Sequence, residues 1–168
     1  SRPIGSAAAA VVMSHQDSSK SGYRFLGAAH LCDTRHNDLC QGDADGGMTD
    51  ASKPLMQTNS EELLVQGVAV AQRTWREAKH ILGWDNQTAD VICTHQVGRA
   101  HRQRLYESLG LDLSRDVATV EFLGNCGSAS LPITVAYAID QQHLSFGNKL
   151  AMLGIGSGIN CMMCGIQC

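Results

Sequence analysis

Residues 90–110 read DVICTHQVGRAHRQRLYESLG, and this stretch decides the fold. Its first part, residues 90–94, is a short apolar run of the kind that forms a buried strand. Residues 97–109 then suit a helix, which Gly110 ends, because glycine is the usual residue just beyond a helix terminus. A strand followed directly by a helix is the repeating unit of sheets with parallel strands, so the sequence predicts an α/β protein.

The same alternation continues toward the carboxyl end. We expect a second strand at residues 119–123, a helix at 130–142 with Pro132 in its first turn, and strands at 149–155 and 159–166. Strands that alternate with helices pair in parallel through right-handed crossovers. The last two strands are separated only by Gly156-Ser157-Gly158, so they are expected to pair antiparallel.

Three elements are expected before residue 90. A helix at residues 59–82 is predicted by Asn59 as its N-cap, by Glu62 three positions on, and by Gly83 at its end. Residues 4–13 read as a buried strand, and some strand is expected at 23–32, with a loop-rich region up to about residue 53. The apolar stripe of the helix consists of Leu64, Val68, Ala71, Trp75, Ala78 and Leu82.

The composition excludes several classes of protein. The 168 residues are 43% hydrophobic, with 17 glycines, which suits one closely packed domain. The net charge of -3 does not indicate a nucleic-acid-binding protein. No apolar run is long enough to cross a membrane, and no signal peptide is evident, so we expect a cytoplasmic protein. The seven cysteines are an odd number and read as reduced, buried thiols.

Polar residues follow two of the predicted strands, where ligands bind in open α/β sheets. His95 follows the strand at 90–94, and Asn125 lies in the loop after 119–123. A neutral imidazole and a carboxamide can both donate hydrogen bonds to a thioester oxygen that becomes an enolate. Taken alone, His95 could equally be an ordinary residue at a helix start, and Asn125 an ordinary turn residue.

Four motifs together resemble the ketosynthase III branch of the thiolase superfamily. The motifs occur in the same order as in that family, and together they cover nearly the whole of this chain. The resemblance implies the carboxyl-terminal half of a thiolase-like layered αβαβα fold. The motifs are Ile4-Gly5-Ser6-Ala7-Ala8-Ala9, Thr94-His95-Gln96, Gly124-Asn125-Cys126-Gly127-Ser128-Ala129-Ser130 and Gly154-Ile155-Gly156-Ser157-Gly158.

Details of these motifs are most similar to the acyl-CoA condensing enzymes of bacterial long-chain olefin biosynthesis. This resemblance implies a Claisen condensation of two fatty acyl-CoA molecules to a β-keto product. His95 and Asn125 would be catalytic and would polarise the thioester carbonyl of the second acyl chain. The Ser157 amide, with Gly156 in the same turn, would help to form the oxyanion hole for the first. No metal or cofactor is implied, because coenzyme A enters as part of the substrate.

The family's nucleophile is a cysteine at a helix N-terminus, where the helix dipole favours the thiolate. None of the seven cysteines here has that context, and Cys126 belongs to the asparagine motif. We therefore expect a partner chain that carries the amino-terminal half, the catalytic cysteine and the general base. Residues 1–14 would be the last strand of that amino-terminal domain, and 15–168 the carboxyl-terminal domain. An unpaired apolar strand is unfavourable in solution, so this half is not expected to be stable alone.

Alternatives remain open at this stage. The chain could belong to a decarboxylating ketosynthase III, to a relative that only transfers acyl groups, or to a non-catalytic subunit that stabilises a ketosynthase. The basic residues after His95 suit either a solvated helix face or a contact with the phosphates of coenzyme A. They are Arg99, His101, Arg102 and Arg104. Cys161 and Cys164 have redox-type spacing but share no strand face, and Cys32, His36 and Cys40 are better explained as loop residues than as metal ligands.

Overall fold

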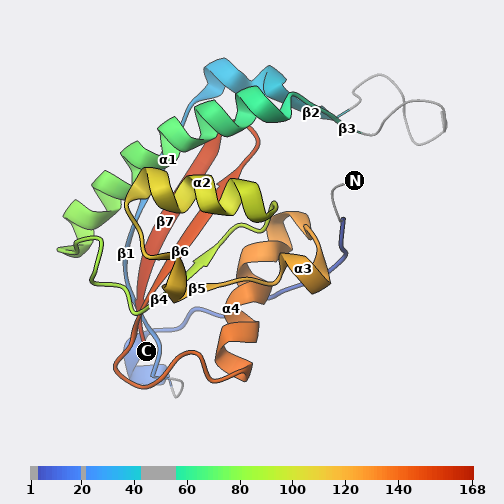
Figure 1. The fold of residues 1–168 in the computed structure, drawn as a ribbon. Coiled ribbons are helices and arrows are strands. Elements are labelled where there is room, and N and C mark those ends of the chain that lie inside the picture. The colour runs from blue at the N-terminus through green and yellow to red at the C-terminus, as the bar shows by residue number, and fades with distance from the viewer. Residues whose placement is uncertain (1–3, 20–21, 43–55) are drawn as a thin grey trace.

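The computed structural model describes residues 4–19, 22–42 and 56–168 (Figure 1). Its strands are β1 (Arg24–Cys32), β2 (Cys40–Gly42), β3 (Met56–Thr58), β4 (Val91–Thr94), β5 (Asp116–Val117), β6 (Lys149–Gly156) and β7 (Asn160–Gln167). Its α-helices are α1 (Ser60–Leu82), α2 (Arg99–Leu109), α3 (Val120–Leu123) and α4 (Ser130–Asp140). Short 3-10 helices are η1 (Gln16–Ser18), η2 (Thr34–Leu39), η3 (Leu113–Arg115) and η4 (Gly127–Ala129).

Five strands form one mixed sheet in the order β1-β7-β6-β4-β5. β4 pairs in parallel with both β5 and β6, as the alternation of strands and helices predicts. β6 and β7 form an antiparallel hairpin in which Gly156 faces Asn160, which confirms the expected tight connection. β1 pairs antiparallel with β7 and confirms the strand expected near residues 23–32.

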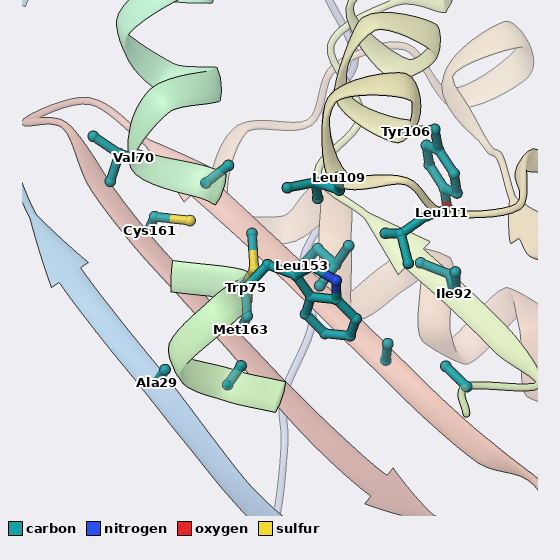
Figure 2. Close-up of a cluster of buried hydrophobic side chains, with 14 of the residues drawn as sticks. Ala29, Val70, Trp75, Ile92, Tyr106, Leu109, Leu111, Leu153, Cys161 and Met163 are labelled. Carbon is teal, nitrogen blue, oxygen red and sulfur yellow. The ribbon is translucent and has the colours of Figure 1, made fainter. Parts of the chain in front are cut away.

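Helices cover both faces of this sheet, and each face has its own apolar core. Alternate residues of the strands point to opposite faces. On β4, Ile92 joins the larger core under α1 and α2, whereas Val91 and Cys93 join the smaller core under α4. Figure 2 shows Trp75 of α1 reaching down onto the strands beside Met163 and Leu153 in the larger core. In the described parts of the chain, no helix combines the length and the apolar character that a membrane span requires.

The helix predicted at residues 59–82 is confirmed together with its caps. The Asn59 side chain accepts a hydrogen bond from the Glu62 amide at 3.3 Å, which satisfies one of the free amides of the first turn. Gly83 ends the helix with φ of 65°, in the left-handed region that favours glycine. Gly110 ends α2 in the same way, with φ of 65°.

The strand predicted at residues 119–123 is wrong. Val120–Leu123 form the short helix α3, and the strand in this part of the chain is β5, which lies earlier, at Asp116–Val117, and pairs with β4. The reason is a side-chain cap: Gln96 Oε1 accepts hydrogen bonds from the amides of Thr119 and Val120. Amides bound to a side chain cannot join a sheet ladder, so the chain turns into a helix at this point.

The strand predicted at residues 4–13 is not formed within this chain. Ile4 makes one isolated bridge to Asn125, and the Gly5 amide donates to the Asn125 carbonyl at 2.9 Å. Beyond that contact no residue of 7–13 belongs to a strand, and Val12 is 91% exposed. The prediction rested on the apolar pattern, which indicates a need for burial but does not supply a neighbouring strand.

Candidate active site

The four site residues predicted from the sequence line one cavity of about 620 Å³. His95, Asn125, Gly156 and Ser157 come from three separate loops and meet at the edge of the sheet where β4 and β6 end. Parallel strands bring their carboxyl ends to the same edge, so the topology explains why His95 meets the Gly156-Ser157 turn. The volume is in the range of small-molecule sites, and much of the wall is apolar. The apolar lining residues are Leu63, Leu64, Val68, Val97, Leu105, Leu131, Pro132, Ile155 and Ile159.

His95 is the first residue after β4 and is held there by the sheet. Its backbone amide donates to the Leu153 carbonyl on β6 at 3.0 Å, which continues the ladder one position beyond the strand. The side chain is half-buried, and burial lowers the pKa of the imidazole below its ordinary value. His95 is therefore neutral at pH 7, and a neutral imidazole can donate a hydrogen bond to a developing oxyanion.

Asn125 lies between α3 and α4, and its carboxamide oxygen accepts two hydrogen bonds from neighbouring residues. Asn125 Oδ1 accepts from the Gly127 amide at 2.9 Å and from the Ser130 hydroxyl at 3.3 Å. Only a carbonyl oxygen can accept from an amide N–H, so these contacts fix which end of the carboxamide is which. The NH2 group of Asn125 is thereby left as the donor for the cavity.

The turn with Gly156 and Ser157 joins β6 to β7 and is anchored from outside the hairpin. Asp33, just after β1, exchanges two backbone hydrogen bonds with Ile159, at 2.8 and 2.9 Å. The Asp33 carboxylate binds Arg35 at 2.7 Å and Arg73 of α1 at 3.1 Å. The hydrogen bonds from Arg35 are the main reason that the pKa of Asp33 lies well below its usual range. β1, α1 and the turn are thus tied together at Asp33.

The first half of α1 forms a wall of the cavity, which the sequence did not reveal. The apolar stripe of this helix changes role along its length: Leu64 and Val68 line the cavity, whereas Ala71, Trp75 and Ala78 lie in the core. A glycine in the helix, Gly67, was the available signal. A Cβ there would lie 3.2 Å from the Ile155 side chain, so glycine allows α1 to approach β6 closely.

The basic residues after His95 divide between the cavity and the surface. His101 and Arg102 line the cavity. Arg99 is 80% exposed and pairs with Glu121 at 2.9 Å, and Arg104 is also exposed. Arg102 lies 3.4 Å from the buried carboxylate of Asp116, whose pKa is raised mainly by burial.

Three of the cysteines are thiols that burial keeps protonated. Burial raises the pKa of Cys161 and of Cys164 to about 11, and it raises the pKa of Cys93 further still. Such thiols are protonated at neutral pH and react slowly. Cys40 lies on the cavity wall, directly after η2. Among the described residues, no three His, Cys, Asp or Glu side chains group as a metal site.

Comparison with known sequences identifies the chain's relatives. The family model "3-Oxoacyl-[acyl-carrier-protein (ACP)] synthase III C terminal" matches residues 80–168. The acyl-CoA:acyl-CoA alkyltransferase of Shewanella oneidensis is 36% identical over 97% of this chain and 48% of its own length. The enzyme of the same name from Xanthomonas campestris is 34% identical over 95% of this chain and 45% of its own length. The chain thus spans about half the length of the curated relatives it matches.

Solved structures give the same result for the fold. A crystal structure of OleA from Xanthomonas campestris superposes with a TM-score of 0.78 at 34% identity, over 87% of this chain and 40% of that one. The 3-oxoacyl-(acyl carrier protein) synthase III of Xanthomonas oryzae superposes with a TM-score of 0.77 at 33% identity, over the same shares. The predicted thiolase-like fold is confirmed by these structures. The chain belongs to the 3-oxoacyl-[acyl-carrier-protein] synthase III family, whose carboxyl-terminal domain it contains.

Proposed function

We propose that this chain is a subunit of a condensing enzyme that joins two fatty acyl-CoA thioesters by a Claisen reaction. The observation that carries the proposal is the meeting of His95, Asn125 and the Gly156-Ser157 turn on one mostly apolar cavity. Hydrogen-bond donors at one end of an apolar cavity suit an acyl thioester, whose carbonyl needs donors and whose alkyl chain needs an apolar wall.

In this proposal His95 and Asn125 activate the second acyl thioester. A base on a partner chain removes the proton from the carbon next to the thioester carbonyl. The negative charge moves to the thioester oxygen, where His95 and the NH2 group of Asn125 donate hydrogen bonds to it. Donors that are already in position stabilise this charge without further reorganisation, which is the main way that such sites lower the barrier.

The Ser157 amide would serve the first acyl chain, which is held as a thioester on a cysteine of the partner. The enolate carbon attacks the carbonyl carbon of that thioester, and the amide stabilises the resulting oxyanion. The C–S bond then breaks, the cysteine leaves as a thiolate, and a β-ketoacyl-CoA remains. No external electron donor or acceptor takes part in this sequence, so the reaction requires no redox cofactor.

Relatives support the choice of fatty acyl-CoA as substrate. Two relatives at 34–36% identity are named acyl-CoA:acyl-CoA alkyltransferases. A structure of OleA from Xanthomonas campestris contains lauric acid and lauroyl-CoA, and it matches this chain with a TM-score of 0.77 at 34% identity, over 87% of this chain and 41% of that one. Arg102 lines the cavity, and its guanidinium, 3.4 Å from the Asp116 carboxylate, is a candidate contact for the phosphates of coenzyme A. With this substrate class, we place the reaction in the cytoplasm and in lipid biosynthesis.

Replacing His95 tests the catalytic assignment in the native protein. We expect His95→Ala to lower kcat for release of CoA from a long-chain acyl-CoA by about 10²–10³-fold, as loss of one oxyanion donor does. His143→Ala is the matched control, because His143 is exposed and lies outside the cavity lining. Unchanged activity of His95→Ala would instead favour a non-catalytic subunit that stabilises a ketosynthase.

The partner is tested separately by counting polypeptides. Denaturing mass spectrometry of the native protein should show the 18.0 kDa chain together with a second chain. After incubation with acyl-CoA, one cysteine of the second chain should carry the acyl group. A lone, folded and monomeric 18.0 kDa chain would contradict the two-chain proposal.

A decarboxylating reaction is the second candidate, because more distant relatives are named β-ketoacyl-[acyl-carrier-protein] synthase III. The enzyme of that name from Rhodospirillum centenum is 27% identical over 92% of this chain and 48% of its own length. Condensation from long-chain acyl-CoA alone supports the first proposal. A strict requirement for a malonyl thioester supports the second, and acyl exchange without carbon–carbon bond formation indicates an acyltransferase.

A further inference from the structure

A chain of buried polar side chains joins the two loops that carry His95 and Asn125. Its members are Gln96, Thr119, Thr134 and Ser130, and each is at most 2% exposed. They come from the loop after β4, from the residue before α3, and from α4. Buried polar groups are costly unless they are paired, so where their hydrogen bonds go is informative.

Gln96 forms the first link and connects the His95 loop to α3. Its Nε2 donates to the Thr94 carbonyl at 2.8 Å, and its Oε1 accepts from the amides of Thr119 at 3.0 Å and Val120 at 3.1 Å. These partners leave a single possible orientation for the carboxamide. The residue next to His95 therefore sets the position of the backbone that leads to Asn125.

The next link is a pair of threonine hydroxyls, Thr119 and Thr134, whose oxygens are 2.7 Å apart. The Thr134 hydroxyl also contacts the carbonyl of Ser130 at 2.8 Å, as the donor. Each hydroxyl has one proton, so Thr134 gives its proton to Ser130 and accepts the proton of Thr119. This arrangement gives every hydroxyl proton an acceptor and fixes the start of α4 against α3.

Ser130 is the last link before Asn125. Its hydroxyl oxygen accepts from the Cys126 amide at 2.8 Å, so its proton is available for Asn125 Oδ1 at 3.3 Å. The Ser130 hydroxyl thus occupies the Asn125 oxygen. The Gly127 amide occupies the same oxygen, at 2.9 Å.

We propose that Gln96, Thr119, Thr134 and Ser130 are positioning residues, which hold the Asn125 NH2 group toward the cavity at a fixed place relative to His95. The inference deepens the proposed function and rests on it. An apolar pair such as two valines would fill the space of the two threonines equally well. The polar pair instead makes the orientation of Asn125 depend on the backbone that follows His95.

Thr134→Val tests the chain at its centre while keeping the side-chain volume. In the native assembled protein we expect kcat to fall about 3- to 10-fold, the factor that one ordinary hydrogen bond represents, with KM changed less than about twofold. Thr134→Ser keeps the hydroxyl and should restore kcat. Thr74→Val is the matched control, because Thr74 is equally buried and donates to the carbonyl four residues earlier, but lies in α1 away from Asn125.

The decisive measurement is the same change in an Asn125→Ala background. If Thr134 acts through Asn125, Thr134→Val has no further effect on kcat there. An equal fall in both backgrounds would overturn the proposal, because it would show a general loss of structure. The proposal would also be overturned if Thr134→Val had the same kcat as the unchanged protein.

A second readout separates this inference from the proposed function. If Asn125→Ala leaves activity unchanged, the proposed function fails, but positioning can still be judged by NMR of protein labelled at the asparagine side-chain nitrogens. Thr134→Val should shift the Asn125 NH2 resonances, and Thr74→Val should not. Unshifted Asn125 resonances in Thr134→Val would overturn the positioning role.

Discussion

The β6–β7 hairpin and the amino-terminal arm, residues 4–13, are both apolar, yet they have opposite surroundings. In the hairpin, Leu153 and Met163 are each 1% exposed. In the arm, Ile4 and Val12 are 89% and 91% exposed. The hairpin has β1 and β4 as neighbours and helices on both faces, whereas the arm touches the rest of the chain at the Asn125 loop. An apolar run therefore shows which segment needs covering, and the topology of the chain decides whether the cover is present.

The largest effect on stability is expected from a residue buried in the β6–β7 hairpin. Leu153→Ala should lower the free energy of unfolding of the native protein by about 2–5 kcal/mol, because it removes a fully buried side chain and leaves a cavity. Urea unfolding measures this change. Phe146→Ala is the control, since Phe146 is 97% exposed, and it should change the free energy by less than about 0.5 kcal/mol. Equal effects of the two substitutions would contradict the core described here.

Two glycine-to-alanine substitutions, one in the hairpin and one in the arm, test how firmly each region is held. At Gly165 of β7 a Cβ would lie 2.8 Å from the Trp84 ring and 3.0 Å from Leu82, so Gly165→Ala should cost about 1–3 kcal/mol of unfolding free energy. At Gly5 a Cβ would overlap the Leu123 carbonyl oxygen. The arm can move away from that contact, so Gly5→Ala should cost less than Gly165→Ala. A larger cost for Gly5→Ala would show that the arm is held as firmly as the hairpin.

One ion pair lies beside the hairpin and another lies beside the arm. We expect stability to depend on pH through the first but not through the second. The pKa of Asp33 is lowered, so its contribution to stability is complete above the ordinary aspartate pKa of about 3.9 and is lost as pH falls below it. Asp33→Asn should therefore be less stable than the native protein at pH 7, with the difference shrinking below about pH 4. Asp17→Asn is the control, because His15 and Asp17 in the arm's continuation are 75% and 79% exposed. A constant difference for Asp33→Asn across pH would contradict the ion-pair assignment.

The smallest effect on the chain itself is expected from a charge in the arm. Val12→Asp leaves the sheet and its helices untouched, because Val12 lies outside both cores. If the partner chain covers the arm, the same change should reduce the amount of assembled protein seen by size-exclusion chromatography. Ser14→Asp adds the same charge at an exposed polar position and should assemble normally. Normal assembly of Val12→Asp would show that the arm is not covered by a partner.

The sequence was sufficient wherever a local pattern and its tertiary surroundings agree. Asn59 and Gly83 were correctly predicted as the ends of α1, because their cap geometry is local. The meeting of His95 with Asn125 followed from the motifs, although Asn125 comes after the helix α3 and not after the predicted strand. Residues 119–123 were mispredicted because the side chain that turns them into a helix, Gln96, lies 23 residues earlier than Thr119. The α1 wall of the cavity was missed for a related reason: an apolar stripe looks the same whether it faces a core or a ligand.

The division of α1 near Gly67 has a consequence for how the protein can evolve. Leu64 and Val68 face the cavity, and Trp75 and Ala78 face the core, although all four lie on one helix. Mutations at Leu64 and Val68 can reshape the cavity while the later turns keep the helix docked. If the proposed function is correct, selectivity for chain length and thermodynamic robustness lie in adjacent but separate segments of α1, so selection can alter one and leave the other intact.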